Sequence, residues 1–409
     1  MAAASGSTHR PTVLQVLPAL ESGGVERGTI DMARFLVKHG WRALVASEGG
    51  RLERDLGMAG GEHVKLPLAS KNPATIALNT GRLKRLIREQ GIDLVHARSR
   101  APAWSARSAT RSLQVPFVTT FHAGFSGWDN PLKKRYSCIM ASGDRVIAIS
   151  DFIAEHVREQ CAVPLERLRV VHRGVDLDYF DPAKVNGLRV AKLTDAWNLE
   201  PDLKVIMLAG RVSRVKGHEV LVRALMRLKR DDFVCLFVGG AERNDSFVTK
   251  VDMQARAAGL AGAVRFVGTC NDMPAAYAIA DVVVVPSIHL EAFGRVSAEA
   301  QAMGKPVIVS NVGGLSETLM PMATGWLVEP DNPEELAEAL DLALDMAPDV
   351  KTRLSQRARS FVAGQYNAET MCRRTEAIYR ELLDGRIPLP PRPADTASAA
   401  TPEMRAIAG

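Results

Sequence analysis

The sequence predicts an α/β protein with two successive doubly wound parallel sheets, each forming a Rossmann-like domain. The chain has 409 residues, more than one hydrophobic core usually supports, so two domains are expected. Short apolar runs alternate with helical patterns through the first part of the chain, which is typical of βαβ units. The same alternation starts again after a less regular segment at residues 178–201. These observations place a domain boundary near residue 180.

The first domain is predicted to span residues 11–180. Apolar runs predict its strands, and amphipathic patterns between several of these runs predict helices. The predicted strands are residues 12–17, 43–47, 64–68, 94–97, 117–121, 145–149 and 168–171. The predicted helices include residues 75–90 and 152–160, and one that follows a Gly-rich turn at residues 22–28. Residues 1–10 are small and polar, so we expect them to be disordered.

The second domain is predicted to span residues 181–367. Its predicted strands are residues 204–209, 233–238, 264–267, 282–285, 307–310 and 325–328, with an amphipathic helix at residues 217–229. A last helix at about residues 368–383 ends the ordered chain. Residues 384–409 are rich in Pro, Ala, Ser and Thr, and we expect them to be disordered. Two sheets of this kind would face one another across a cleft, which is where we expect the chemistry.

Charge and cysteine content restrict the class of protein. The net charge is +6, of which residues 1–180 carry +8 and the remainder −2. A basic first half suggests an anionic partner, with nucleic acid and a membrane surface as alternatives. No apolar run is long enough to span a bilayer, and the N-terminus lacks the apolar core of a signal peptide. The five cysteines are scattered without a CxxC pair, so we expect no disulfide framework, no zinc site and a cytoplasmic location.

The stretch from residue 286 to residue 317 carries the strongest functional signal. It follows four consecutive valines and contains two carboxylates, Glu291 and Glu299, on either side of Phe293-Gly294. Gly294 frees the backbone where a helix would begin, so amide N–H groups there can face an anion. This pattern favours a site for a ligand with hydroxyls and a phosphate. On these residues alone, the two glutamates have two other interpretations. In the first, Glu299 is a solvated helix residue and Glu291 is an ordinary loop residue. In the second, the two form an acid/base pair.

Cations and glycines follow the predicted strands of both halves. Gly210, Arg211 and Lys216 lie in a loop that leads to a helix N-terminus, an arrangement that suits a diphosphate. Gly240, after a later strand, fits close passage of a nucleotide, although a turn would serve equally well. The loop with Gly23 and Gly24 opens a helix in the first half. The chain contains neither GxGxxG nor GxxxxGK[ST], which argues against a simple dinucleotide or ATP site.

A histidine and a basic aromatic segment stand out in the first half. His122 ends a predicted strand, and a histidine in that place is either structural or catalytic. The segment that follows brings Trp128 together with three cations, Lys133, Lys134 and Arg135. Aromatic residues beside cations suit an anionic bilayer or a lipid head group. A solvated helix face is the alternative interpretation.

Together these motifs resemble the retaining nucleotide-sugar glycosyltransferases of family 4, which have the two-domain GT-B fold. The resemblance rests on EAFGRVSAE, AMGKPVIVSNVGGLSE, GRVSRVKG and VHRGVD, and it covers most of residues 12–383. It implies a nucleotide diphosphate sugar held by the second domain and an acceptor held mainly by the first. It also implies retention at the anomeric carbon, no required metal, and a last helix that crosses back to the first domain.

The resemblance implies a role for each donor-side motif residue. Glu299 would bind the ribose hydroxyls, and Glu291 would bind the hydroxyls of the transferred sugar. Arg211 and Lys216 would hold the diphosphate. The donor would also meet the backbone at Phe293, Gly294 and the Gly23-Gly24 loop, and His122 would lie near the reacting sugar. The chain departs from the family at Arg173, where an asparagine is frequent, and at residues 96–98, where a second histidine is frequent.

The resemblance therefore implies a hexosyltransferase that uses a UDP- or GDP-linked sugar. The predicted acceptor is an envelope glycan or glycolipid such as lipopolysaccharide core. The enzyme would act in the cytoplasm, with peripheral contact to the inner face of the cytoplasmic membrane and no nucleic-acid partner. Two alternatives are a nucleotide-sugar epimerase on the same fold and a basic scaffold that binds membrane or nucleic acid.

Overall fold

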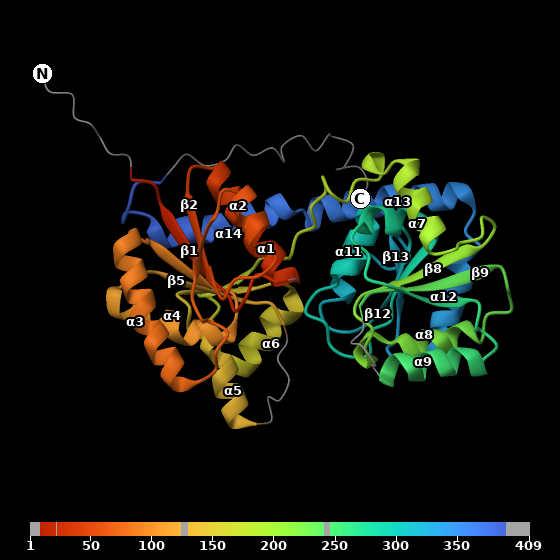
Figure 1. Ribbon diagram of the computed structural model, residues 1–409, viewed down its shortest axis with the longest axis horizontal. Coiled ribbons are helices and arrows are strands. Elements are labelled where there is room, and N and C mark those ends of the chain that lie inside the picture. The colour runs from red at the N-terminus through yellow and green to blue at the C-terminus, as the bar shows by residue number, and fades with distance from the viewer. Residues whose placement is uncertain (1–8, 22, 124–129, 241–245, 390–409) are drawn as a thin grey trace, which may run out of the picture. The chain divides into compact units, whose positions relative to one another are not determined.

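The computed structural model describes residues 9–389 except residues 22, 124–129 and 241–245 (Figure 1). Most of the two terminal segments expected to be disordered therefore lies outside the described residues. The described chain forms two sheets, one of seven strands and one of six. The predicted pair of doubly wound parallel sheets is confirmed.

The first sheet has the strand order β3-β2-β1-β4-β5-β6-β7. The register is parallel in the pairs β1–β2, β1–β4, β2–β3 and β6–β7. Its strands are β1 Thr12–Val16, β2 Arg42–Ser47, β3 Glu62–Lys65, β4 Leu94–Ala97, β5 Phe117–Phe121, β6 Arg145–Ala148 and β7 Leu168–Val170. Its helical segments are α1 Gly24–Lys38, α2 Glu53–Met58, α3 Pro73–Gln90, α4 Arg100–Leu113, α5 Pro131–Ser137, η1 Cys138–Ser142 and α6 Asp151–Cys161.

The second sheet has the order β10-β9-β8-β11-β12-β13 and is parallel throughout. Its strands are β8 Lys204–Ala209, β9 Phe233–Val238, β10 Val264–Gly268, β11 Val282–Val285, β12 Val307–Ser310 and β13 Gly325–Val328. The helices along this part of the chain are α7 Gly187–Ala196, α8 His218–Leu225, α9 Ser246–Ala257, α10 Met273–Ile279, α11 Arg295–Ala302, α12 Pro333–Leu344 and α13 Pro348–Gln365. The 3-10 segments in this part of the chain include η2 Pro182–Lys184, η3 Arg214–Lys216 and η4 Ser316–Thr318.

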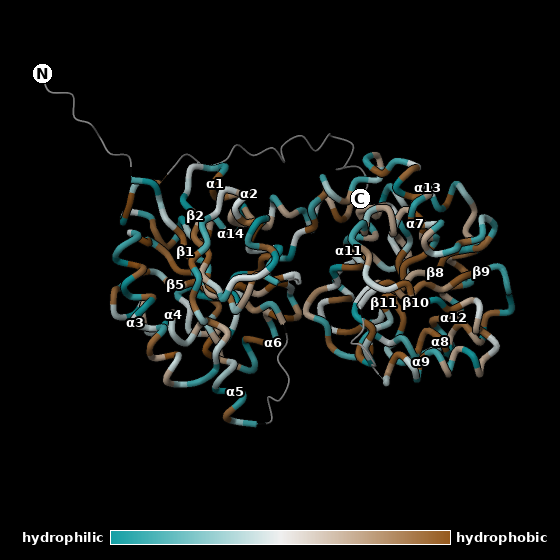
Figure 2. The backbone as a smooth tube through the Cα atoms, in the orientation of Figure 1, coloured by the Kyte–Doolittle hydropathy of each residue, from teal (hydrophilic) through white to brown (hydrophobic). Residues whose placement is uncertain are grey.

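Burial on both faces explains why β8, β9, β11 and β12 are almost continuous apolar runs. All four residues of β11 are valines, and all are buried. Helices α8, α9 and α12 contribute to the core against one face, and α11 and α13 cover the other (Figures 1 and 2). A parallel sheet covered by helices on both faces requires apolar side chains on both, which is why alternation of polar and apolar residues is absent.

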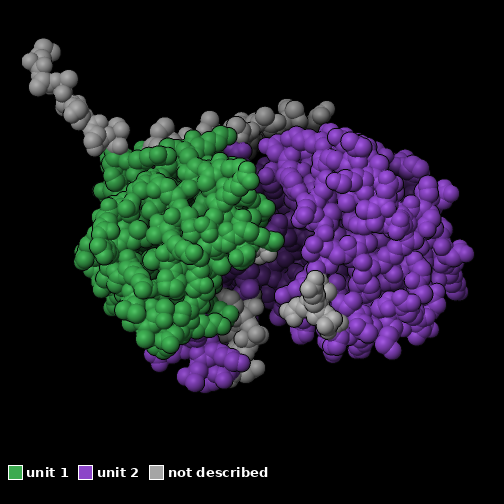
Figure 3. Space-filling view, in the orientation of Figure 1, with its two compact units in different colours: residues 1–118, 372–409 green, residues 119–371 purple. Residues whose placement is uncertain are grey.

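By its internal contacts the chain divides into two compact units, coloured separately in Figure 3. One unit comprises residues 1–118 and 372–409, and the other comprises residues 119–371. The final helix, α14 Ala368–Leu383, supplies most of its length to the first unit. There the Trp41 indole N–H donates to Glu376 Oε1 (3.0 Å), and Tyr379 Oη lies 2.6 Å from His96 Nδ1. Helix α14 therefore packs into the core of the first unit.

Two expectations about local structure need correction. The helix predicted over residues 217–229 is shorter, because α8 ends at Leu225. No disulfide framework was expected, but Cys138 and Cys161 form a disulfide across a sequence separation of 23 residues. The pair joins η1 to the end of α6, a proximity that the spacing in the sequence does not indicate. Among the described residues, no helix is both long and apolar enough to cross a bilayer.

Candidate functional site

A pocket of about 330 Å³ lies at the carboxyl edge of the second sheet. The sheet order reverses between β8 and β11, and in open α/β sheets ligands bind at such a switch point. The ends of β8 and β9 supply one wall of the pocket, and helices α10 and α11 supply another. The residues that line it include Gly210, Arg211, Gly239, Thr269, Met273, Tyr277, Arg295 and Glu299.

Glycine at the end of β9 lets two backbone segments pass closely beside the pocket. A Cβ atom on Gly239 would lie 1.8 Å from the Gly210 carbonyl oxygen, a distance that no side chain can occupy. The sequence singled out Gly240 in this turn. The structure instead places Gly239 in the pocket wall, while the Gly240 carbonyl accepts from the Val212 N–H (3.1 Å). In this turn, Gly239 allows the close approach of the two backbone segments and also lines the pocket.

The two cations predicted in the loop after β8 have different surroundings. Arg211 is exposed and lines the pocket. Lys216, the last residue of η3, has its Nζ 2.6 Å from Glu291 Oε1. The same carboxylate oxygen accepts from the hydroxyl of Ser287, which is fully buried. Lys216 and Glu291, 75 positions apart in the sequence, thus form one half-buried ion pair rather than two separate contacts.

Glu299 is nearly buried, with 7% of its surface exposed, and protein groups hold both carboxylate oxygens. Its Oε1 accepts from Arg295 Nη2 (2.6 Å), and its Oε2 accepts from the Tyr277 hydroxyl (3.0 Å). Burial, together with the Glu299 carboxylate, raises the pKa of Tyr277 well above its ordinary value. Tyr277 is therefore a neutral hydrogen-bond donor at any physiological pH.

The loop between the two glutamates is fixed by the Gly-Gly turn that follows β12. Glu291 forms an isolated parallel bridge with Gly313, and the Gly314 N–H donates to the Glu291 carbonyl (2.8 Å). A Cβ atom on Gly314 would lie 2.4 Å from the Ala292 carbonyl oxygen, so only glycine allows this approach. Phe293 is buried, and its ring lies edge-on to Tyr366 at 5.2 Å between centroids. Gly294 is the N-cap residue of α11, so the helix begins where the sequence predicted.

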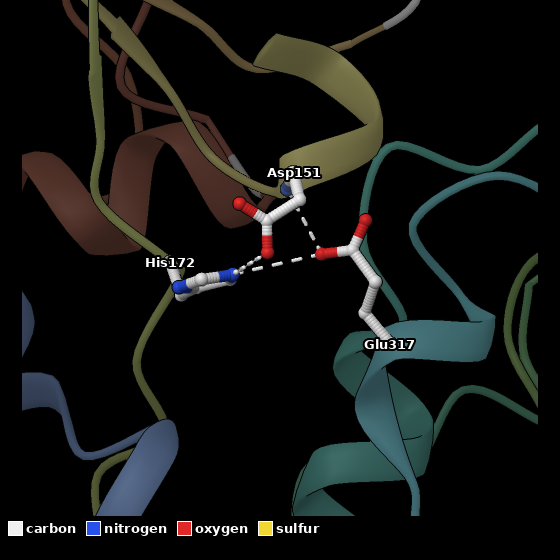
Figure 4. A group of neighbouring side chains, drawn as sticks. All are labelled: Asp151, His172 and Glu317. Atoms are coloured by element: carbon white, nitrogen blue, oxygen red, sulfur yellow. Dashed lines mark hydrogen bonds and ion pairs between the residues drawn. The ribbon is translucent and has the colours of Figure 1, made fainter. Parts of the chain in front are cut away.

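A second cluster, which the sequence did not indicate, joins Asp151, His172 and Glu317 (Figure 4). The Glu317 carboxylate accepts the backbone N–H groups of Asp151 (2.9 Å) and Phe152 (2.7 Å), the first amides of α6. His172 Nε2 lies 3.4 Å from Asp151 Oδ2 and 3.5 Å from Glu317 Oε2. Both Glu317 oxygens are thus committed to the helix N-terminus, and the cluster is organised as a helix cap.

The ionisation of this cluster follows from its contacts. Hydrogen bonding to Glu317 raises the pKa of His172 above its ordinary value, and Asp151 adds to the rise while burial opposes it. Burial alone would raise the pKa of Glu317, but hydrogen bonds from His172 and the two amides lower it below its ordinary value. The two carboxylates therefore favour the protonated form of His172 more than water does.

His122, at the end of β5, contacts the residue at which the chain departs from the resembled pattern. Its Nδ1 lies 3.1 Å from Arg173 Nη1, and Arg173 is buried. A guanidinium has only donors, so Nδ1 must accept, and a neutral His122 carries its proton on Nε2. This contact fixes the tautomer of the imidazole.

The remaining predicted residues are not among those that line the pocket. Gly23 is the N-cap of α1 and Gly24 its first residue, and both belong to the other compact unit. Lys133 and Arg135 are exposed on α5, and Lys134 is half-buried. Trp128 lies outside the described residues.

Comparison with known proteins gives two family models that together follow most of the chain. Residues 22–179 match the model described as glycosyltransferase family 4, and residues 191–361 match the one described as glycosyl transferases group 1. A D-inositol 3-phosphate glycosyltransferase of Catenulispora acidiphila is 32% identical over 316 residues, which cover 72% of this chain and 73% of that protein.

Solved structures agree with the fold. The crystal structure of a glycosyltransferase from Rickettsia africae is 37% identical, covers 92% of this chain and 99% of its own, and has a TM-score of 0.86. The Anabaena HepE protein in complex with UDP-glucose is 22% identical, covers 90% and 99%, and has a TM-score of 0.77. The second similarity concerns the fold alone.

Proposed function

We propose that this chain, which belongs to the GT4-type glycosyltransferases and has their GT-B fold, is a retaining hexosyltransferase. The donor would be a nucleotide diphosphate sugar, and the acceptor a hydroxyl group. The observation that carries the proposal is the pocket at the switch point of the second sheet. It combines a cation, Arg211, with a buried carboxylate, Glu299, and it adjoins the loop that holds the Lys216–Glu291 pair.

The proposed donor is UDP- or GDP-linked. Glu299 offers carboxylate oxygens to ribose hydroxyls, and Arg211 offers a charge to the diphosphate. The crystal structures of Anabaena HepE with UDP and with UDP-glucose, proteins of the same fold, support a uridine nucleotide as the first donor to test. Glu291, fixed by Lys216 and Ser287, is proposed to accept from hydroxyls of the transferred sugar.

In the proposed reaction the bond between the anomeric carbon and the diphosphate oxygen breaks, and its electron pair leaves with the diphosphate. The acceptor oxygen bonds to the same face of the anomeric carbon, and its proton is released. Negative charge develops on the leaving diphosphate, so the step needs a cation more than a strong base. Arg211 and Lys216 would supply it, and we expect turnover without an added divalent metal. His122, with its tautomer fixed by Arg173, is proposed to lie near the reacting sugar.

Two acceptors are proposed, and both are anionic. The first is an envelope glycan or glycolipid such as lipopolysaccharide core, with the exposed cations of α5 facing the acceptor or an anionic membrane. The second is D-inositol 3-phosphate, which the name of the Catenulispora relative suggests. Cytoplasmic location with peripheral membrane contact belongs to the first proposal only.

The test is a transfer assay with UDP- and GDP-linked hexoses and either D-inositol 3-phosphate or a lipopolysaccharide-core acceptor. We expect one donor–acceptor pair to give a product that keeps the anomeric configuration of the donor. Glu291→Ala and Lys216→Ala should lower the rate about 10²–10³-fold. Near-normal transfer by both variants would remove the proposed roles of these residues. Epimerised donor without transfer would favour the alternative of an epimerase.

A further inference from the structure

Arg295 occupies a position that local helix energetics disfavour. It is the first residue of α11, where the helix dipole favours anions and a cation costs about 0.3–1 kcal/mol. Its i,i+4 partner is Glu299, and the order of arginine before glutamate is the less favourable of the two. Helix stability therefore gives no reason for an arginine here, and its contact inside the pocket becomes the relevant one.

That contact holds one side of the Glu299 carboxylate, and Tyr277 holds the other. Arg295 Nη2 donates to Oε1 (2.6 Å), and the Tyr277 hydroxyl donates to Oε2 (3.0 Å). Tyr277 is fully buried, whereas 38% of the Arg295 side chain is exposed. The carboxylate is thus clamped between a buried neutral donor on α10 and a partly exposed cation on its own helix. All three residues line the same pocket.

The clamp leaves room for a particular kind of ligand. A carboxylate can accept about four hydrogen bonds, two on each oxygen. The hydrogen bonds described for the Glu299 side chain use one acceptor position on each oxygen. One further position on each oxygen matches a pair of neighbouring hydroxyls, as on a ribose. The same cation also reduces the cost of keeping an ionised carboxylate nearly buried.

We propose that Arg295 is a positioning and specificity-determining residue, which together with Tyr277 fixes the Glu299 carboxylate for two vicinal ribose hydroxyls. The consequence is selection of ribonucleotide donors over donors that lack these hydroxyls. The inference rests on the proposed function, since it requires a nucleotide in this pocket. It differs from a direct role of Arg295 at the diphosphate or the base, in which case the sugar hydroxyls of the nucleotide would not matter.

The test is a binding matrix measured by isothermal titration calorimetry on the full chain. The ligands are UDP and 2′,3′-dideoxyuridine diphosphate, with GDP and its dideoxy form in a parallel series. The proteins are wild type, Arg295→Met, Arg295→Lys and Tyr277→Phe. The matched control is Arg353→Met, which removes an i,i+4 ion pair of α13 that is exposed and outside the pocket. Melting curves without ligand check that each variant folds. If Arg295→Met does not fold, Arg295→Lys and Tyr277→Phe are used for the test.

We expect Arg295→Met and Tyr277→Phe to weaken binding of the ribonucleotide about 10- to 100-fold, because each removes a hydrogen bond to a charged group. Binding of the dideoxy ligand should change less than about threefold, Arg295→Lys should be intermediate, and Arg353→Met should match wild type. Equal losses for both ligands, or no loss for the ribonucleotide, would overturn the inference. Failure of wild type to bind either ribonucleotide would overturn the proposed function itself, so the two failures are distinguishable.

Discussion

The buried ion pair on α14 gives a stability prediction that can be worked out from the structure. Glu376 Oε1 accepts from Arg380 Nη2 (2.6 Å) and Nε (2.9 Å) and from the Trp41 indole N–H (3.0 Å). Only 3% of the Glu376 side chain and 10% of the Arg380 side chain are exposed. The perturbation is Glu376→Leu, which leaves a buried guanidinium and a buried indole N–H without this acceptor.

Removing one member of a buried pair costs about 3–5 kcal/mol, since the other charge stays desolvated. For a unit of this size each kcal/mol corresponds to roughly 2–4 °C, so the melting temperature of the unit should fall by roughly 6–20 °C. The double variant Glu376→Met/Arg380→Met removes both charges. It should recover most of the loss and stay about 1–2 kcal/mol below wild type, because Trp41 still lacks its acceptor.

Differential scanning calorimetry at constant pH measures these shifts. The control is Glu89→Leu in α3, which removes an i,i+4 pair with Arg85 whose side chains are 57% and 79% exposed. This control should change the unfolding free energy by less than about 0.5 kcal/mol. The reasoning fails if Glu376→Leu unfolds within about 1 kcal/mol of wild type, or if the double variant is no more stable than the single one.

Three further predictions concern His172, the disulfide and the independence of activity from metal ions. Because the folded-state pKa of His172 is raised, its contribution to stability is fully present below about pH 6.5 and is lost as the pH rises through the raised value. The unfolding free energy of wild type should therefore decline between about pH 6 and 9, and that of His172→Gln should not. Parallel pH profiles of the two proteins would contradict this prediction. Cys138→Ser should lower the unfolding free energy by about 3 kcal/mol under oxidising conditions, because the disulfide closes a loop of 23 residues, and should leave it unchanged in reductant. If wild type and Cys138→Ser were equally stable under oxidising conditions as well, the disulfide would be contradicted. Transfer activity should survive treatment with EDTA, and loss of activity that Mg²⁺ or Mn²⁺ restores would refute metal independence.

The strands of the second sheet could be predicted almost residue by residue. Predicted and observed bounds agree at β8, β9, β11, β12 and β13. Burial on both faces makes β8, β9, β11 and β12 almost continuous apolar runs, which the sequence shows directly. The same reasoning placed Glu299 and Arg211 after such strands, and the structure brings both into one pocket.

Partners that come from separate elements could not be predicted. Tyr277 and Glu299 are 22 positions apart and meet only because α10 and α11 line one pocket. Lys216 and Glu291 were predicted as independent groups, and their pairing depends on where η3 lies relative to the loop after β11. No local pattern marks such pairs, since periodicity reports only which face of an element is buried.

The sequence did not indicate the cluster in Figure 4. Glu317 ends the stretch from residue 286 that the sequence singled out, but its role as a cap on α6 requires the tertiary structure. Arg173 was noted as a departure from the family, and its contact with His122 explains what the side chain does there. The disulfide had no usable signal, because neither cysteine lies in a recognisable motif.

The central claim, a nucleotide diphosphate sugar held at Glu299, is tested most directly by thermal stabilisation. Wild type and Glu299→Gln are melted with a panel of UDP- and GDP-linked hexoses. A donor present at 100 times its dissociation constant adds about 2.7 kcal/mol, which corresponds to roughly 5–11 °C for a domain of this size. The account predicts such a shift for at least one donor in wild type and a much smaller shift in Glu299→Gln. No shift with any donor, or an equal shift in both proteins, would contradict it.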